Sequence, residues 1–380
     1  MRSARARHTP AAPHAAPQGM LRRLAVVLLV SLCAAQQPRP AVADAPPSAE
    51  PPQSEALAPT ATKAEPGEHS SASAPKRRLR LGVALRATRP WSFPATVTPV
   101  LFGSALAFEV EDRFGPLKLL LTLGTTLAVH AAGNLMNTLF DYRNGYDGTG
   151  SSDQTLLSGD LDTAQATRLI GVAYAAAAAC LAPLAWLSSA PSWQLGLSSL
   201  LGAASAYVYT GGPGLKYKAL GDVLITTTFG PLLVGFAYLA QCSGFPGASV
   251  LVPALALAAP IEAILHANNA RDTEEDARNG VRTLARMLGP RASSHLYAAL
   301  LAVPFAYSTV QAWRRSLLGA LPLLAAPLAR KLVAAFRRGD FVDLPKKTAK
   351  FQAVLGALMT AAALLPSHTV PALSTILAPS

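Results

Sequence analysis

From Trp91 onward the sequence alternates between long apolar stretches and short polar breaks. Leu169 to Leu215 contains no Asp, Glu, Lys or Arg, and Phe351 to Ser380 again has none. Val223 to Ala270 contains only Glu262. A globular helix needs one polar face, so a soluble fold cannot bury such runs. Each run is long enough for one or two bilayer crossings of about 20 residues. The pattern predicts a polytopic membrane protein.

The polar breaks predict an all-helical fold, a bundle of nine transmembrane helices with its active site at one membrane surface. The expected helices are 92–108, 117–141, 165–187, 193–209, 222–241, 249–269, 292–312, 317–335 and 350–366. Prolines inside or near several of these ranges indicate kinks, which packing in a bundle tolerates.

The basic residues support this helix count. Let side A be the membrane side that carries the chain just before the first helix. Of the Lys and Arg residues from position 76 onward, 22 then fall on side A and 4 on the opposite side. Because positive charge gathers in cytoplasmic loops, side A is expected to face the cytoplasm or the stroma. This topology explains most of the net charge of +12, so nucleic acid is not an expected partner.

Composition narrows the class further. Charged residues make up 14% of the 380 residues, against roughly 25% in an average soluble domain. The three cysteines, Cys33, Cys180 and Cys242, lie far apart without the spacing of a metal site or a disulfide framework. A soluble enzyme, a disulfide scaffold and a wholly disordered chain are all excluded.

Residues 1–80 differ from the rest and are interpreted as a targeting leader followed by a disordered linker. The first 43 residues carry six Arg and no acid, and an apolar run from Leu24 to Ala35 precedes a small-residue stretch. That order resembles a signal peptide. An ER or Golgi membrane is the favoured location, with a plastid or mitochondrial membrane as the alternative. Residues 81–370 are expected to form one domain.

Two polar motifs end expected helices on side A. In the first, His130, Asn134, Asn137 and Asp141 are spaced 4, 3 and 4, so they share one helix face, and Asp147 follows. The second contains the polar residues Glu262, His266, Asn268, Asp272, Asp276 and Arg278. Ionisable groups at membrane depth are costly and usually mark a site or a pathway.

Two facing carboxylate clusters suit magnesium, which prefers carboxylates together with substrate phosphates and water. Lys216, Arg278, Asn137 and Asn268 could then contact the remaining oxygens of a diphosphate. The adjacent apolar bundle would hold a long hydrocarbon tail. Transfer of an isoprenoid group requires this combination.

Simpler interpretations exist for each element. One Asp-xxx-Asp pair is often a solvated helix cap, but two such clusters on the same side fit that interpretation poorly. The two histidines fit hydrogen-bonding or packing roles better than catalysis. Glu262 has either a structural role or a pairing with one of them. Asp153 either belongs to a turn or is an additional metal ligand. Gly211 to Gly214 fits a turn better than a phosphate-binding loop.

The spacing Asn137-xxx-Asp141-xxx-Gly145-x-Asp147, together with Asp272-xxx-Asp276, resembles the UbiA superfamily of intramembrane prenyltransferases. The resemblance covers about residues 84 to 366. Three stretches are most similar to the animal-type menaquinone-4 synthases: AVHAAGNLMNTLFDYRNGYD, YTGGPGLKYKALGDVLITTTFGPL and ILHANNARDTEEDARNGVRTLARMLG. Bacterial and plastid 1,4-dihydroxy-2-naphthoate prenyltransferases share much of this pattern.

The resemblance implies roles at matching positions. Asn137, Asp141 and Asp147 belong to a first magnesium-diphosphate motif, and Asp272 and Asp276 to a second. Further expected contacts are Lys216 and Arg89 to the diphosphate and Tyr209 near the reacting carbon. Relatives often carry Arg where this chain has Gln154, a departure that removes one positive charge from that loop.

The expected activity is Mg²⁺-dependent transfer of a polyprenyl group, geranylgeranyl by preference, from its diphosphate to menadiol or 1,4-dihydroxy-2-naphthoate in menaquinone or vitamin K biosynthesis. Departure of the diphosphate would leave an allylic cation on the prenyl chain. The π faces of Tyr209 or Tyr217 and of Phe140 would stabilise that cation. The alternatives are an acceptor of the plastoquinone, tocopherol or chlorophyll type, and a non-enzymatic transporter or sterol-regulatory membrane protein.

Overall fold

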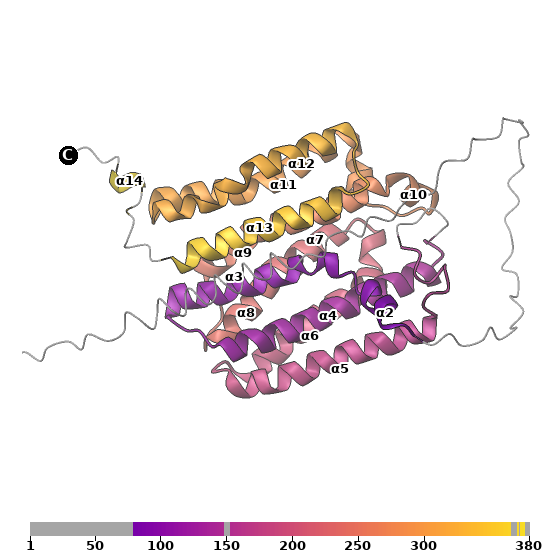
Figure 1. The fold of residues 1–380 in the computed structure, drawn as a ribbon, viewed down its shortest axis with the longest axis horizontal. Coiled ribbons are helices and arrows are strands. Elements are labelled where there is room, and N and C mark those ends of the chain that lie inside the picture. Colours follow the sequence, from indigo (N-terminus) through magenta and orange to yellow (C-terminus); the bar gives the residue numbers. More distant parts are fainter. Residues whose placement is uncertain (1–78, 148–152, 366–370, 372, 377–380) are drawn as a thin grey trace, which may run out of the picture.

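The computed structural model describes residues 79–147, 153–365, 371 and 373–376, and within them the chain is all-helical. The helices run alongside one another in a single bundle (Figure 1). No strand forms in these residues, where the backbone makes one isolated bridge, between Lys218 and Arg282. Almost all of the expected leader, residues 1–78, lies outside the described part.

The helix bounds follow the apolar stretches closely. The first half comprises α2 (Leu81–Ala87), α3 (Pro94–Glu111), α4 (Pro116–Arg143), α5 (Thr163–Leu187), α6 (Ser192–Thr210), α7 (Gly221–Thr227) and α8 (Leu233–Gln241). The second half comprises α9 (Ala248–Arg271), α10 (Thr273–Arg278), α11 (Leu284–Arg314), α12 (Ala326–Arg338), α13 (Leu344–Leu364) and α14 (Leu373–Ile376). Segments of 3-10 helix flank them at η1 (Pro90–Ser92), η2 (Leu215–Tyr217) and η4 (Leu317–Ala325).

A helical segment overlaps every range expected from the sequence. By length and composition, five of the described helices could cross a membrane: Pro116–Arg143, Thr163–Leu187, Gly221–Gln241, Ala248–Arg271 and Leu317–Arg338. The segments Leu81–Ser92 and Pro94–Glu111, bent by 57° from each other, raise the number to six if they form one span. The count of nine spans therefore stays a prediction.

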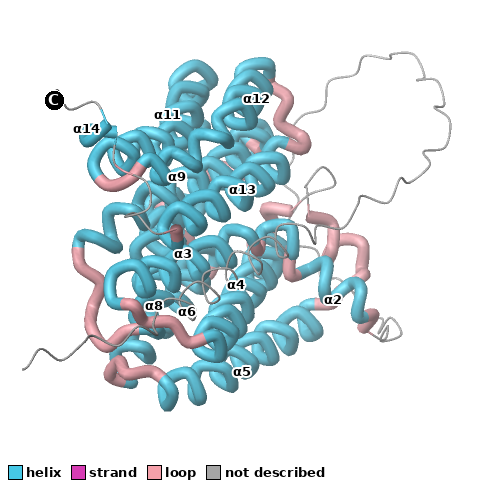
Figure 2. The backbone as a smooth tube through the Cα atoms, turned by 60° about the vertical axis from the view of Figure 1, so that its left-hand side comes forward, coloured by secondary structure: helices cyan, strands magenta, loops and turns pink. Residues whose placement is uncertain are grey.

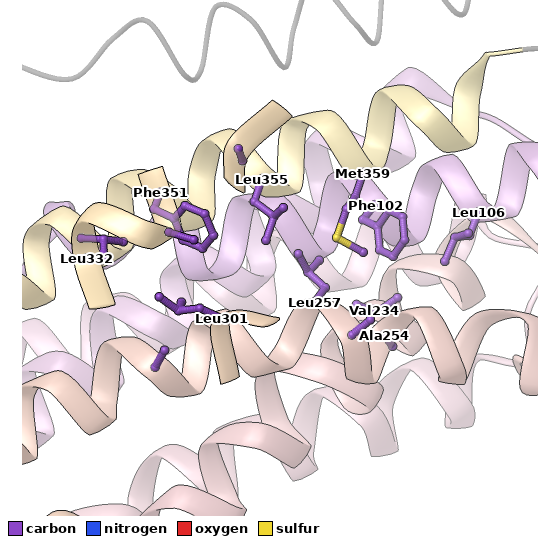
Figure 3. Close-up of a cluster of buried hydrophobic side chains, with 14 of the residues drawn as sticks. Phe102, Leu106, Val234, Ala254, Leu257, Leu301, Leu332, Phe351, Leu355 and Met359 are labelled. Carbon is purple, nitrogen blue, oxygen red and sulfur yellow. The ribbon is translucent and has the colours of Figure 1, made fainter. Parts of the chain in front are cut away.

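The main hydrophobic core lies between α3, α9, α11 and α13. Its members include Phe102 of α3, Leu257 of α9, Leu301 of α11 and both Phe351 and Leu355 of α13, which Figure 3 shows meeting between their helices. These side chains are at most 2% exposed. This core fixes α9, one of the two helices that carry an acidic motif.

A π-helical turn, η3 (Thr228–Leu232), interrupts the span between α7 and α8. Gly230 in this turn lies against α9, where a side-chain carbon would come within 2.6 Å of the Cβ atom of Ala258. Only glycine permits that approach, because any Cβ atom would clash there. The turn therefore holds α7 and α8 tightly against α9.

Both acidic motifs lie at the same end of the bundle. The C-terminal ends of α4 and α9 lie there, together with the short helices α2 and α10 (Figure 1), and α2 is also seen beside α4 in Figure 2. The helix α14 lies at the opposite end (Figure 1). The fold thus brings together segments that are more than a hundred residues apart in sequence.

Candidate active site

A cavity of about 1110 Å³ opens at this end and extends between α4, α6, α7, α8 and α9. Nearly all of the residues expected at the site line it: Arg89, Asn137, Asp141, Asp147, Tyr209, Lys216, Asn268, Asp272 and Asp276. Deeper in the bundle the walls become mostly apolar, with Phe229, Leu232, Leu233 and Ile264 among the lining residues. The cavity is therefore charged at its mouth and mostly apolar below, with Thr and Ser hydroxyls such as those of Thr125 and Ser198 among the deeper lining.

Asp141 is the most fully engaged carboxylate of the first motif. It is 5% exposed. The Nζ atom of Lys216 donates to its Oδ2 atom at 2.7 Å, and the hydroxyl of Tyr217 donates to Oδ1 at 2.7 Å. Lys216 also lies 3.3 Å from the amide oxygen of Asn137, one turn earlier on α4. Burial and the charge of Asp141 raise the pKa of Tyr217, so its hydroxyl stays a donor.

Asp153 is fixed by a second set of contacts. It accepts hydrogen bonds from the Nη2 atom of Arg89 at 2.8 Å, from the hydroxyl of Thr138 at 2.6 Å, and from the backbone and hydroxyl of Thr155. Burial opposes its ionisation, but Arg89 and the two hydroxyls outweigh burial and hold the pKa of Asp153 below its usual range. The ionised form of Asp153 is thus favoured, and it anchors Arg89 beside α4.

The pKa values of Asp147 and Asp276 are raised, in contrast to the lowered pKa of Asp153. Burial, with Asp141 and Asp153 adding to it, raises the pKa of Asp147 to about 7. Burial likewise raises the pKa of Asp276 to about 6, with Asp272 adding to the rise against the opposing charge of Lys216. For both carboxyls the largest cause is burial, which disfavours the charged form. A cation bound at either position would favour the ionised carboxylate.

The second motif lies where α9 passes into α10. Asp272 pairs with its neighbour Arg271 through both carboxylate oxygens, at 2.7 and 2.8 Å. The backbone N–H of Asp276 donates to the carbonyl of Asp272 at 2.8 Å, so the two side chains are one helical turn apart. The expected shared face is therefore present.

Contacts through Tyr146, Tyr217 and Lys216 join the two motifs. The side-chain amide of Asn279 donates to the carbonyl of Tyr146 at 2.8 Å, and the N–H of Arg282 donates to the carbonyl of Tyr217 at 3.1 Å. The rings of Tyr146 and Tyr217 pack with their centroids 4.3 Å apart. Lys216 interacts electrostatically with both Asp141 and Asp276. The lysine therefore lies between the two acidic motifs.

The histidines have structural partners, as the sequence suggested. His130 hydrogen-bonds through Nδ1 to the hydroxyl of Thr96 at 2.7 Å, which ties α4 to α3. His266 hydrogen-bonds to Ser293 at 2.8 Å and stacks on Phe336. Pairing of Glu262 with either histidine was the wrong alternative. Its carboxyl is 5% exposed and faces Asp222 of α7 instead.

Two expected contributors lie away from the cavity. Arg278, at the end of α10, is exposed and does not line the cavity, because α10 turns that face toward the outside. Phe140 packs edge-on against Tyr207 with the ring centroids 6.1 Å apart and is also absent from the lining.

Other lining residues were not identified from the sequence. Tyr146 and Asn279 stand inside the two quoted motif stretches but belong to no catalytic spacing, and Asp343 and Lys346 come from the start of α13. Only the fold reveals their position at the cavity, since no motif connects α13 with the acidic segments.

The donor set fits Mg²⁺ that arrives together with a diphosphate. Among the described residues, no three His, Cys, Asp or Glu side chains are grouped so that they could hold a metal ion by themselves. Magnesium is usually bound by one or two carboxylates, with phosphate and water completing its shell. Asp147 and Asp276 line the cavity, and burial raises the pKa of each, so a cation that favours their ionised form matches that requirement.

Comparison with known proteins agrees with this geometry. Residues 96–355 match the UbiA prenyltransferase family. The chain is 41% identical over 297 residues to UbiA prenyltransferase domain-containing protein 1 of Gallus gallus, which covers 78% of this chain and 89% of that relative. It is 41% identical over 289 residues to the Homo sapiens protein of the same name, covering 75% and 84%.

Solved structures share the fold. A UbiA homologue from Aeropyrum pernix superposes with a TM-score of 0.56 at 15% identity, covering 69% of this chain and 96% of that one. A UbiA homologue from Archaeoglobus fulgidus bound to GPP and Mg²⁺ gives 0.51 at 18% identity, covering 74% and 99%. The family match spans most of the bundle and both acidic motifs. This chain belongs to the UbiA prenyltransferase family and is a prenyltransferase.

Proposed function

We propose that this protein transfers a geranylgeranyl group from its diphosphate to a naphthoquinol ring, menadiol or 1,4-dihydroxy-2-naphthoate, in menaquinone or vitamin K biosynthesis. The observation that carries the proposal is the convergence of two acidic motifs on Lys216 at the mouth of an apolar cavity. The homologue bound to GPP and Mg²⁺ supports a prenyl diphosphate donor. Similarity to UbiA prenyltransferase domain-containing protein 1 supports the choice of acceptor class.

In this proposal the mouth of the cavity binds the diphosphate. Asp147, Asp272 and Asp276 would hold Mg²⁺, whose positive charge would stabilise the diphosphate as it leaves. Lys216 would turn from Asp141 to the phosphate oxygens, and the amides of Asn137 and Asn268 would donate to the same oxygens. Asp141, released from the lysine, would then be free to take part in cation binding.

Bond breaking separates the diphosphate oxygen from the first carbon of the prenyl chain and leaves an allylic cation. Tyr209 and Tyr217 line the cavity beside Lys216, where their π faces would stabilise that cation. The apolar walls exclude water, so the cation reacts with the quinol ring rather than with water. A carbon–carbon bond forms, and the ring then loses a proton or, in dihydroxynaphthoate, the carboxyl group.

The proposed location is an integral position in an ER or Golgi membrane, with the domain at 81–370 following a leader at 1–80. The apolar helices support membrane insertion. A transporter or sterol-regulatory role fits less well, because transporter sites are typically near the bilayer midplane whereas these acids gather at one end of the bundle.

The test is prenyl transfer by the purified full-length protein in lipid vesicles with Mg²⁺ and geranylgeranyl diphosphate. Menadiol, dihydroxynaphthoate and homogentisate are offered in parallel, and products are identified by mass spectrometry. The expected result is a prenylated naphthoquinol that disappears when EDTA removes the metal. Preferential prenylation of homogentisate would favour the tocopherol or plastoquinone type. No prenylated product with any acceptor would overturn the proposal.

A further inference from the structure

The apolar part of the cavity has a definite depth. Its lining on α4 runs from Asp141 at the mouth to Thr125 at the deep end. These residues are 16 positions apart, so the cavity is about 24 Å deep along the helix at about 1.5 Å per residue. The lining on α6 runs from Tyr209 to Ser198, about 17 Å, and the lining on α7 and α8 runs from Leu224 to Phe236, about 18 Å at the same rise per residue.

This depth corresponds to four isoprene units. Each unit adds four carbon–carbon bonds of about 1.5 Å, so an extended unit is about 5 Å long and four units about 20 Å. A diphosphate at the level of Asp141 takes up most of the remaining length. A fifth unit would have to pass the deep end of the cavity.

Phe236 closes that deep end. Its side chain lines the cavity and is only 5% exposed. On its other side it belongs to a buried cluster with Leu184, Leu195 and Leu239, and Leu121 of α4 packs against the same cluster. The ring is therefore the floor between the cavity and a filled hydrophobic core, so removing it would lengthen the cavity.

Gly202 keeps the middle of the cavity open. It lines the cavity from α6, and a Cβ atom at this position would have no neighbour within 4 Å. It lies seven positions before Tyr209, which places it about 10 Å below the reacting end at about 1.5 Å per residue. A larger side chain here would project into the path of a tail after about two isoprene units.

We infer that Gly202 and Phe236 set the length of the prenyl chain that this protein transfers, with Gly202 admitting the distal half of a four-unit tail and Phe236 stopping a fifth unit. The inference rests on the proposed function, since it assigns the apolar part of the cavity to the prenyl tail. It names the donor class as the C20 diphosphate on geometric grounds.

The chain offers a matched control for Gly202. Gly196 lies on the same helix, and a Cβ atom there would likewise have no neighbour within 4 Å, but Gly196 does not line the cavity. The variants Gly202→Leu and Gly196→Leu therefore add the same side chain at similar sites, and only the first fills the cavity. Phe236→Ala provides a change of opposite sign.

The experiment gives each full-length variant an equimolar mixture of C10, C15, C20 and C25 prenyl diphosphates with one quinol acceptor. Product ratios by mass spectrometry report the relative kcat/KM of the donors. Gly202→Leu is expected to lower the C20-to-C10 ratio by about 10- to 200-fold, the range that hydrophobic pockets achieve for small changes in fit. Phe236→Ala is expected to raise the C25-to-C20 ratio by about tenfold. Gly196→Leu should leave both ratios unchanged.

Because the readout is a ratio within one sample, a loss of folded protein does not imitate the expected result. An unchanged C20-to-C10 ratio in Gly202→Leu, or an equal shift in Gly196→Leu, would overturn the inference while transfer itself continues. Wild-type protein that transfers none of the four donors would instead overturn the proposed function, and the inference with it.

Discussion

The two acidic motifs use their carboxylates differently. In the first, Asp141 is paired with Lys216 and accepts a hydrogen bond from Tyr217, and Asp153 in the loop that follows is paired with Arg89. In the second, Asp272 is paired with its neighbour Arg271, and burial raises the pKa of Asp276. Asp141 is thus held in place before any ligand binds, whereas burial raises the pKa values of Asp147 in the first motif and of Asp276 in the second, and a bound cation would lower both.

This difference assigns Lys216 a central part, because it is the cation shared by both motifs. Lys216→Ala is expected to lower kcat/KM for prenyl transfer by about 100- to 1000-fold, the usual cost of removing one preorganised electrostatic group. Lys216→Arg should recover part of the loss. Steady-state kinetics with labelled donor measures both variants, and full activity in Lys216→Ala would contradict the shared role.

Asp276 tests the second motif alone. Asp276→Asn removes a carboxylate charge with little change in shape, and it should raise the Mg²⁺ concentration for half-maximal activity by about tenfold or more. Glu274→Gln is the matched control, since Glu274 is exposed on the same short helix and does not line the cavity. Equal metal dependence in the two variants would show that the second motif binds no cation.

The raised pKa values predict a smaller effect that depends on pH. Asp147 and Asp276, with pKa values of about 7 and about 6, bind protons as the pH falls, and protons compete with Mg²⁺. The rise in Tm caused by Mg²⁺ with diphosphate should therefore be larger at about pH 8 than at about pH 5.5.

Without ligand, the stability of the protein is expected to change with pH in the opposite direction. A folded-state pKa above the unfolded value of about 4 means that these two groups favour folding at low pH and disfavour it above pH 7. Thermal unfolding at both pH values, with and without ligand, checks the two signs together. A ligand-induced rise in Tm that does not change with pH would contradict the assignment of both carboxylates.

The smallest effect is expected at Arg278. Its side chain is exposed and lies away from the cavity, so Arg278→Ala should change kcat/KM by less than about twofold. The same kinetic assay measures it beside Lys216→Ala. A loss comparable to that of the lysine variant would show that α10 turns toward the diphosphate during catalysis.

The sequence predicted the helices well because uncharged runs of this length have few structural alternatives. It also predicted which residues of each motif share a helix face, since a spacing of four places Asp141 one turn after Asn137 and Asp276 one turn after Asp272. It did not predict contacts between distant segments. The ion pair of Arg89 with Asp153 joins loops 64 residues apart, and no local pattern encodes it.

Other positions also depended on the fold. Arg278 stays a predicted diphosphate contact, and the structure places it exposed at the end of α10, outside the cavity lining. For Glu262 the sequence left a structural role and a pairing with a histidine open, and the structure places its carboxyl beside Asp222 of α7, a contact that no local pattern encodes. The depth of the tail cavity depends on packing between helices and therefore required the structure.

The central claim is that both acidic motifs act on one diphosphate. The most direct test measures transfer of labelled geranylgeranyl from its diphosphate in vesicles that contain Asp141→Ala, Asp272→Ala or the control Glu274→Ala. The account predicts that each of the first two variants loses at least about 99% of the activity while the control keeps it. Full transfer by both Asp141→Ala and Asp272→Ala would contradict the site assignment.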